Sequence, residues 1–375
     1  MELGGEVKIC HWRKIVELGS GRTGSVSLCI EQSCPGDKTC GEINQRVFHA
    51  VKRVPRKCMT NSGAVRRVMR EKEALEQLKG HHGIVELRFT SKDADSLYFV
   101  LEPLVGGPLH RHIRGGPGGH FEVPVAKFYS SEMTSAIAHM HSHGFVHRDI
   151  KASNIVLSST GHAKLVDMGC CKRLERLRSN STGDVGTTCN DSCEKTYTYC
   201  GTPHSMAPEM VSRTGHGLAV DWWSLGIVIH EMLNGEPPFG YKADDLPQRI
   251  TAGLPREKFC GENARVQTNG GPVASGIPRQ KDTGGEGADE AVFLSIVRQL
   301  LDTDPARRLG SSRGGDEVMC HAWFEGVNWK RIAKLETEPP AFRRDVGELE
   351  FLEGESGRKN GIAQDIDPEG LFAGF

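Results

Sequence analysis

Three polar side chains of complementary chemistry stand within six residues of one another: Asp149, Lys151 and Asn154. Apolar residues flank them in the stretch 146–154. Phosphoryl transfer from ATP needs such a set, because a carboxylate takes the proton of the acceptor hydroxyl, a cation lies beside the moving phosphoryl group, and an amide oxygen holds a magnesium ion. The stretch alone is a hypothesis, which gains weight only if the other parts of such a site follow in the right order.

Length and composition narrow the class of protein. The chain has 375 residues, enough for one large two-lobed domain or two ordinary domains. Its 47 Lys+Arg and 48 Asp+Glu give a formal net charge of −1, which argues against nucleic acid or an anionic membrane as the main partner. No apolar run reaches transmembrane length, and twelve cysteines without a secretory signal suggest reduced thiols. We therefore expect a cytoplasmic protein, for which the nucleus is also accessible, with no membrane span.

A glycine-rich stretch with the pattern GxGxxGxV lies near the N-terminus. A dinucleotide-binding unit shares GxGxxG, but there the glycines open a helix. Here β-like runs precede and follow, which predicts a β-turn-β flap whose backbone amides can approach phosphates. Taken alone, a plain glycine-rich hairpin fits about equally well. The stretch consists of Gly19, Ser20, Gly21, Arg22, Thr23, Gly24, Ser25 and Val26.

A lysine and two glutamates follow on predicted regular elements. Residues 47–54 alternate as a strand that carries Lys52, which could alone be a solvated charge. Apolar residues at helical spacing predict a helix over 63–80, and this helix contains Glu71 and Glu73. Either glutamate could pair with the lysine.

The second half of the chain contains further motifs and three polar insertions. A predicted hairpin over 155–166 ends in Asp167-Met168-Gly169, and an unusually apolar helix is predicted over 221–235. Cys34 and Cys40 could bind a metal, but no second pair has matching spacing, so we prefer incidental thiols in an insertion. The insertions are 31–47, 174–194 and 255–288.

Taken together, these motifs resemble the eukaryotic Ser/Thr protein kinases of the AGC group, nearest the cyclic-nucleotide-dependent kinases. The resemblance implies an α+β, bilobal fold with a β-rich N-lobe (8–102), a helical C-lobe (103–332) and a tail (333–375) that wraps back to the N-lobe. The lysine two places after the aspartate is the Ser/Thr form. The matching motifs are HRDxKxxN at 147–154, GxGxxGxV at 19–26, CGTP at 200–203, APE at 207–209, DWWSLG at 221–226, RLG at 308–310, WFEGVNW at 323–329 and FxxF at 372–375.

The resemblance assigns the chemistry of Mg-ATP-dependent transfer to Ser/Thr hydroxyls of protein substrates. Asp149 would orient the acceptor hydroxyl and accept its proton, and Lys151 would stabilise charge near the γ-phosphate. Asn154 and Asp167 would hold Mg²⁺.

The same resemblance assigns ATP binding. Lys52 would contact the α- and β-phosphates under the 19–26 flap, held by Glu71, which the family register favours over Glu73. The adenine would lie among the hinge backbone of Glu102 and Leu104 and the side chains of Val26, Ala50 and Val156.

Regulation is implied as well. Thr198 matches the activation-loop phosphosite, so an upstream activating kinase is an expected partner; the alternative is an unmodified loop residue. Arg148 and Lys172 would receive the phosphate, and Arg67 would link it to the helix carrying the glutamate. Glu209 should pair with Arg308.

The tail implies one more contact. Phe372 and Phe375 would dock into an N-lobe pocket, although a frayed apolar terminus is the simpler alternative. The sequence contains no cyclic-nucleotide-binding module and no phosphosite after the second phenylalanine. Control by cyclic nucleotides would therefore need a separate regulatory subunit or a module outside this sequence.

Two departures from the family concern substrate choice. Basophilic members read substrate arginines with carboxylates, and here Pro108 and Ser153 replace two of them while Glu231 is kept. We expect a relaxed or different arginine preference. Met168 in place of phenylalanine, the insertions and these losses leave a pseudokinase or scaffold as the alternative, and a small-molecule kinase fits the APE and DWWSLG motifs poorly. Because the catalytic residues are all present, we favour an active kinase.

Overall fold

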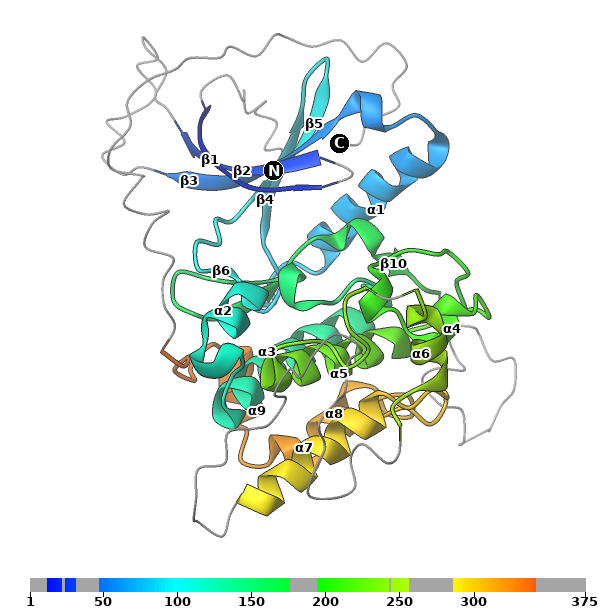
Figure 1. The fold of residues 1–375 in the computed structure, drawn as a ribbon. Helices are drawn as coiled ribbons and strands as arrows, with labels where there is room; N and C mark the ends of the chain where they lie inside the picture. Colours follow the sequence, from blue (N-terminus) through cyan, green and yellow to red (C-terminus); the bar gives the residue numbers. More distant parts are fainter. Residues whose placement is uncertain are drawn as a thin grey trace, which may run out of the picture. The chain divides into compact units, whose positions relative to one another are not determined.

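The computed structural model divides the described chain into two compact units (Figure 1). The first holds the described residues up to Gly80 together with Val85–Gly106; the second holds His81–Ile84 and everything described from Gly107 on. Most of the three predicted insertions and of the predicted tail lies outside the described residues. The structure describes residues 12–21, 24–31, 47–175, 194–242, 244–255 and 286–341.

An antiparallel five-stranded sheet with the order β1-β2-β3-β5-β4 and one helix beside it form the first unit (Figure 1). Helix α1 begins after Asn61, whose side chain accepts a hydrogen bond from the Ala64 amide. It ends at Gln77, about one turn short of the predicted end, because the chain turns away and Gly80 has φ 101°. The elements are β1 (Trp12–Gly21), β2 (Gly24–Glu31), β3 (Phe48–Pro55), α1 (Ser62–Gln77), β4 (Leu87–Lys92) and β5 (Ser96–Leu101).

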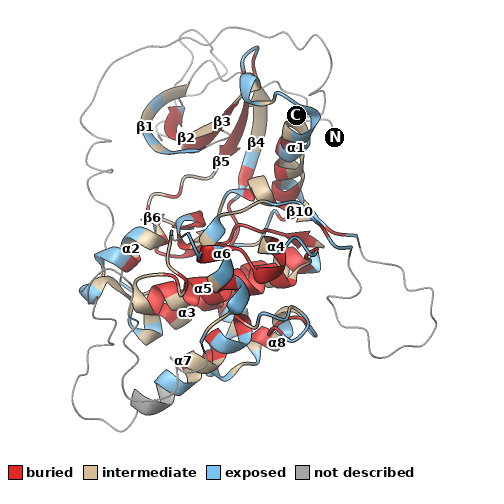
Figure 2. Cartoon of the chain, turned by 45° about the vertical axis from the view of Figure 1, so that its right-hand side comes forward, coloured by how far each residue is buried: buried red, intermediate tan, exposed pale blue. Residues whose placement is uncertain are grey.

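Helices dominate the second unit and surround α5 (Ala219–Asn234), which is buried along nearly its whole length (Figure 2). A helix that is apolar on most faces must be covered on most faces, as its sequence predicts. The other helices are α2 (Leu109–Gly115), α3 (Val123–Ser142), α4 (Pro208–Val211), α6 (Leu246–Ala252), α7 (Glu286–Leu300), α8 (Gly315–Met319) and α9 (Trp329–Ala333).

Short strands in the second unit flank the stretch 146–154. Residues 147–151, called the catalytic loop below, lie between β7 and a 3-10 turn, Ala152–Asn154, that leads into β8. The strands are β6 (Gly107–Pro108), β7 (Phe145–Val146), β8 (Ile155–Leu157), β9 (Ala163–Leu165) and β10 (Lys172–Arg173), which form a β6-β8-β9 sheet and a β7-β10 pair. A sheet-rich unit and a helical unit confirm the predicted α+β fold class.

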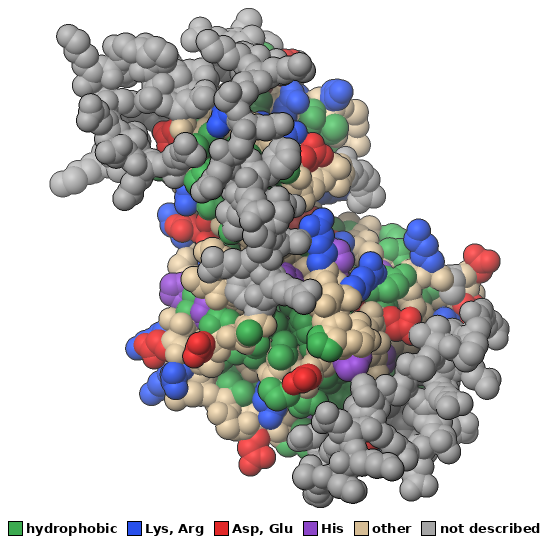
Figure 3. Space-filling model, turned by 60° about the vertical axis from the view of Figure 1, so that its left-hand side comes forward, with side chains coloured by type: hydrophobic (Ala, Val, Ile, Leu, Met, Phe, Trp, Pro, Cys, Tyr) green, Lys and Arg blue, Asp and Glu red, His purple; other side chains and the backbone are tan. Residues whose placement is uncertain are grey.

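Basic and acidic side chains are interspersed over the coloured part of the face in Figure 3, as a near-zero net charge suggests. Within the described ranges, every helix is too short or too polar to cross a membrane.

Candidate active site

Asp149, Lys151 and a residue from a distant segment, Thr202, form a closed hydrogen-bonded cluster in the second unit. Lys151 Nζ donates to Asp149 Oδ2 (2.9 Å) and to Thr202 Oγ1 (2.6 Å), and the Thr202 hydroxyl donates to Asp149 Oδ1 (2.7 Å). Both carboxylate oxygens therefore have a fixed donor, one of them a cation. Charge-assisted bonds of this kind are the stronger ones in proteins, so they orient the carboxylate.

Asn154 also contacts this aspartate. Its Nδ2 donates to the Asp149 carbonyl oxygen (2.9 Å) and to Oδ2 (3.1 Å). Since both bonds use the amide nitrogen, the amide oxygen is the atom left for a cation. The Val166 amide donates to the Asn154 carbonyl (2.9 Å) and so ties the segment leading to Asp167 to this loop.

The donor set suits magnesium. Asp167 is exposed and has φ 61°, and it follows β9 by two residues. Mg²⁺ prefers oxygen ligands and is commonly held by one or two protein groups together with substrate phosphates and water. In the described part of the chain, no group of three His, Cys, Asp or Glu side chains could hold a metal by itself. One carboxylate and one amide oxygen therefore fit an ion that binds together with a nucleotide.

A buried aspartate on α5 supports the backbone of the catalytic loop. Asp221 accepts hydrogen bonds from the amides of His147 and Arg148 and from His141 Nε2, each at 2.8 Å. Burial would raise the pKa of Asp221, but these bonds and the nearby histidines outweigh it, so its pKa lies below the usual value. Arg148 has φ 67°, an unfavourable conformation for a side chain of its size, and it directly precedes Asp149.

The first unit carries the predicted lysine–glutamate pair. Lys52 Nζ lies 2.6 Å from Glu71 Oε1, and both side chains are buried. Glu73, the rival, accepts instead from Gln77 Nε2 (3.2 Å) on the exposed side of α1. The structure thus selects the glutamate that the family register favours.

The glycine-rich stretch is the predicted β-turn-β unit. Gly19 pairs with Val26, and Gly21 pairs with Gly24; Arg22 and Thr23, at the tip, lie outside the described residues. A Cβ atom on Gly24 would overlap the carbonyl oxygen of Arg53 on β3, so this position requires glycine.

The residues expected around adenine lie partly in each unit. Ala50 is on β3 between Leu28 and Leu101, and Leu104 is buried. Glu102 follows β5 and exchanges two hydrogen bonds with Glu86. Val26, Ala50, Glu102 and Leu104 belong to the first unit, and Val156, on β8, belongs to the second.

Comparison with known proteins decides the family: the protein kinase domain family matches residues 12–324. The chain belongs to the protein kinase family. It is 32% identical over 328 residues to a cAMP-dependent protein kinase, catalytic subunit-like, of Caenorhabditis elegans, covering 87% of this chain and 68% of the relative. It is also 32% identical over 332 residues to the cAMP-dependent protein kinase catalytic subunit PRKX of Mus musculus, covering 88% and 76%. The protein is thus a Ser/Thr kinase of the AGC group.

In this kinase, Thr198 is exposed between Tyr197 and Tyr199. The described contacts of the two expected phosphate acceptors go to other residues of the segment. Arg148 donates to the Cys170 carbonyl (2.8 Å) and, at 3.5 Å, to Thr196 Oγ1; Lys172 lies 3.8 Å from Glu194.

Three further regulatory residues can be placed only in part. Arg67 is exposed on α1 in the first unit. The two tail phenylalanines, Phe372 and Phe375, lie outside the described residues.

The predicted structural ion pair of the kinase is present. Arg308 Nη1 and Nη2 donate to the two carboxylate oxygens of Glu209 at 2.7 and 2.9 Å, in a bidentate arrangement with both side chains buried. Arg308 also donates to the backbone carbonyls of Asp302 and Ala219. The pair therefore connects α4 to the start of α5 and to the segment after α7.

Sequence reasoning missed Thr202. It is part of the CGTP motif that was used only to identify the family, and its hydroxyl contacts both Asp149 and Lys151. A hydroxyl inside a conspicuous motif after the activation segment was the available signal. Its partners lie 53 and 51 residues away, so no local spacing points to them.

Proposed function

We propose that this kinase is catalytically active and transfers the γ-phosphate of Mg-ATP to Ser/Thr hydroxyls of protein substrates. The observation that carries the proposal is the cluster of Asp149, Lys151, Thr202 and Asn154. A chain that had lost catalysis would have no need to hold this carboxylate with a lysine, a threonine and an asparagine.

In the proposed reaction, the substrate hydroxyl hydrogen-bonds to Asp149. The hydroxyl oxygen forms a bond to the γ-phosphorus while the bond from that phosphorus to the β–γ bridging oxygen breaks, which leaves ADP. The hydroxyl proton passes to Asp149. Lys151 places its charge beside the oxygens of the moving group, and Thr202 keeps the carboxylate and the ammonium together.

The binding of ATP is part of the proposal. We propose that Lys52, positioned by Glu71, binds the α- and β-phosphates, and that Asn154 and Asp167 hold the magnesium ion. Bound Mg²⁺ would neutralise negative charge on the phosphates. A buried lysine whose ammonium nitrogen lies 2.6 Å from Glu71 Oε1 is well oriented for such a role.

The test is transfer of labelled phosphate from Mg-ATP to a mixture of Ser/Thr peptides. Wild-type protein should label peptides, and Asp149→Asn should lower kcat by about 10²–10⁴, the usual contribution of a positioned base. Asp93→Asn is a matched control, since Asp93 is a buried aspartate in the β4–β5 turn of the first unit. Failure of Thr198-phosphorylated wild type to label any peptide would favour the pseudokinase or scaffold alternative.

We further propose activation by an upstream kinase at Thr198. Its exposure makes the hydroxyl accessible, and a phosphate there would add nearly two negative charges, for which Arg148 and Lys172 are the proposed acceptors. Thr198→Ala should lower kcat sharply, and treatment of wild type with a phosphatase should do the same. Equal kcat of the alanine variant and the phosphorylated wild type would refute activation through Thr198.

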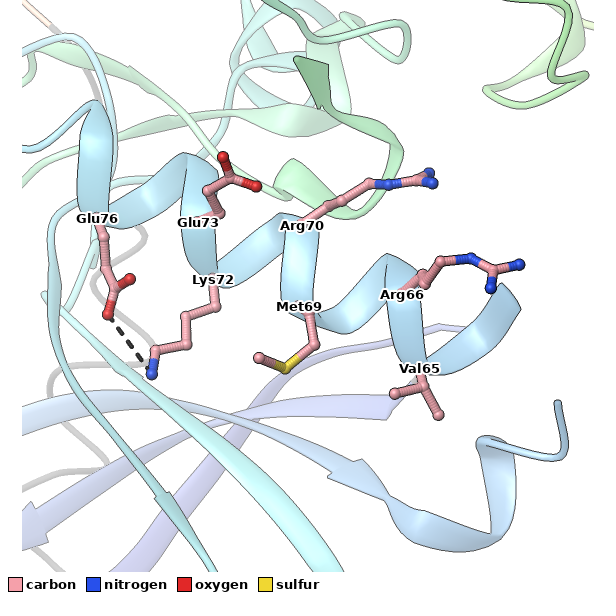
Figure 4. A pocket seen from close by; sticks show the side chains of 7 residues that line it. All are labelled: Val65, Arg66, Met69, Arg70, Lys72, Glu73 and Glu76. Atoms are coloured by element: carbon pink, nitrogen blue, oxygen red, sulfur yellow. Dashed lines mark ion pairs between the residues drawn. The ribbon is translucent and has the colours of Figure 1, made fainter. Parts of the chain in front are cut away.

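We also propose that Phe372 and Phe375 of the tail (333–375) dock beside α1. Figure 4 shows a hollow along this helix, in which Val65, Met69 and the ion-paired Lys72 and Glu76 point to the same side. Two apolar side chains there offer a surface for aromatic rings. Removing the last five residues should lower kcat, and a synthetic peptide of those residues should restore it, whereas its Phe→Ala version should not. Unchanged kcat after truncation would contradict the docking.

Boundaries and partners complete the proposal. We propose lobes at 8–102 and 103–332, a cytoplasmic location, and, if cyclic nucleotides control the kinase, control through a separate regulatory subunit or a module outside this sequence. The relatives' names mention cAMP, and this supports the last point by similarity alone. Adding cAMP to the isolated chain should leave its kcat unchanged, and fractionation of cells should recover the chain without membranes.

A further inference from the structure

A buried carboxylate on α5 has its hydrogen-bond partner inside the protein. Glu231 is 3% exposed, and the hydroxyl of Tyr241 donates to its Oε1 at 2.7 Å. The guanidinium of Arg114, near the end of α2, lies over the Tyr241 ring at 5.5 Å from its centroid. A cation, a phenol and a carboxylate from three different segments of the second unit therefore form one group.

Contacts lead from this group to the catalytic loop. The ring of His204 meets the Tyr241 ring edge to face, with centroids 5.2 Å apart. His204 follows Thr202 by two residues. Burial and the nearby charge of Lys151 lower the pKa of His204, while Asp149 opposes them, so the histidine stays neutral within reach of both catalytic charges. The group therefore lies beside the place where an acceptor segment must bind.

A buried carboxylate beside a phosphoacceptor site is chemically suited to bind a substrate arginine or lysine, because a charge-assisted bond gains strength away from water. In this chain, the protein itself already supplies the hydrogen-bond donor and the positive charge that such a substrate residue would bring to the carboxylate. Tyr241 occupies one oxygen of Glu231, and the charge of Arg114 acts on the same carboxylate. Burial nevertheless raises the pKa of Glu231, which further weakens it as an anion.

Two positions that could supply a further carboxylate do not do so in this chain. Pro108 lies on β6 opposite Val156, and the exposed Ser153 lies one residue before Asn154; these are the two positions where the sequence analysis noted a missing carboxylate. A substrate cation would have to compete with the Tyr241 hydroxyl for this carboxylate and approach the charge of Arg114.

We propose that Tyr241 determines substrate specificity in this kinase: its hydroxyl caps Glu231, so the enzyme accepts Ser/Thr segments without preferring a basic residue at the position that reaches this carboxylate. The inference rests on the proposed kinase activity and names the substrate class of that site. Tyr241 acts here as a substitute for the substrate's own donor.

The test compares peptides in pairs. The two members of a pair are identical except for arginine or alanine at one position, and each of the six positions before the acceptor is tested in turn. For wild type, the ratio of kcat/KM between arginine and alanine peptides should stay within about threefold of one at every position. Tyr241→Phe removes only the hydroxyl and should raise that ratio about tenfold or more at one position, through KM, which is the size of one charge-assisted hydrogen bond. Adding Glu231→Gln should abolish the gain.

Tyr98→Phe is a matched control, because Tyr98 also donates its hydroxyl to a carboxylate, Asp93, at 2.7 Å, but in the first unit. It should leave every ratio unchanged. A wild-type preference for arginine above tenfold at the responding position, or a Tyr241→Phe ratio that does not move, would overturn the proposal.

The same peptides with alanine as acceptor separate this inference from the proposed activity. Their dissociation constants, measured by fluorescence anisotropy in the presence of Mg-ADP, should show the same Tyr241→Phe gain. Absence of transfer from every protein would refute the activity, whereas the binding ratios would still decide the role of Tyr241.

Discussion

Replacing Asp221 by asparagine tests how strongly the buried helix α5 holds the catalytic loop. The carboxylate accepts two hydrogen bonds at Oδ2, from His147 and His141, and one at Oδ1, from Arg148. Asparagine keeps one oxygen and presents an NH₂ group in place of the other. If the oxygen stays with the two donors at Oδ2, the NH₂ group faces the Arg148 amide, and neither has an acceptor.

The cost follows from these contacts. A hydrogen bond to a charged group contributes about 1.5–3 kcal/mol, and a buried donor left without an acceptor adds about 1–3 kcal/mol. We therefore expect Asp221→Asn to lower the free energy of unfolding by about 3–5 kcal/mol, as for other broken buried charge networks. The unfavourable backbone of Arg148 would relax without its bond, and its neighbour Asp149 would move with it. A displacement of about 1 Å at a reacting group can cost about 10²-fold, so kcat should fall by about that factor.

Urea unfolding followed by tryptophan fluorescence measures the first effect, because four of the five tryptophans lie in the second unit. Phosphate transfer to a peptide, under conditions where the variant is folded, measures the second. Asp93→Asn is the control, since Asp93 also accepts three bonds, from two backbone amides and from Tyr98, but in the other unit. Our reasoning fails if folded Asp221→Asn has wild-type kcat, or if Asp93→Asn lowers kcat equally.

Three further predictions address other contacts. Thr202→Val, which loses the bonds to the catalytic aspartate and lysine, should lower kcat about tenfold to a hundredfold, whereas Thr202→Ser should keep most activity; equal kinetics of the two variants would contradict this. Glu209→Gln leaves the buried Arg308 guanidinium without its full partner and should lower the free energy of unfolding, measured in urea, by about 3–5 kcal/mol. A measured decrease below about 1 kcal/mol would contradict this prediction. Burial and nearby Arg148 lower the pKa of His216 to about 4. The unfolded chain, with an ordinary histidine pKa near 6.5, then binds a proton that the folded chain refuses, so stability is full above about pH 6.5 and falls as pH decreases toward 4. His216→Gln should flatten that slope in unfolding curves between pH 4.5 and 7.5, and an unchanged slope would speak against it.

Contacts made within a single motif or between neighbouring elements could be predicted from the sequence. Asp149, Lys151 and Asn154 are close in space because they share one turn. The pairing of Lys52 with Glu71 follows from a strand and a helix of readable periodicity, once the family register chooses between two glutamates. Here local propensity and tertiary packing favour the same arrangement.

Contacts between distant segments could not be predicted from the sequence. Thr202 reaches Asp149 across 53 residues, part of which lies outside the described structure, and a hydroxyl carries no periodic signal. Tyr241 is a single aromatic residue in a loop. It meets Glu231 because α5 ends at Gly235, whose φ of 78° suits glycine and turns the chain back along the helix. Such a turn fixes a partner only after the direction of the returning loop is known.

Helix α5 therefore serves two tasks at separate points. Asp221 and Glu231 are ten residues apart, about 15 Å along a helix, and they share no hydrogen-bond partner in the described contacts. Effects at sites this far apart are usually additive within about 0.5 kcal/mol. The double variant Asp221→Asn/Tyr241→Phe should accordingly show the kcat loss of the first change and the arginine-to-alanine ratio of the second. If the ratio gain disappears in the double variant, Asp221 also shapes the surface that selects the substrate, and the two tasks of the helix are coupled.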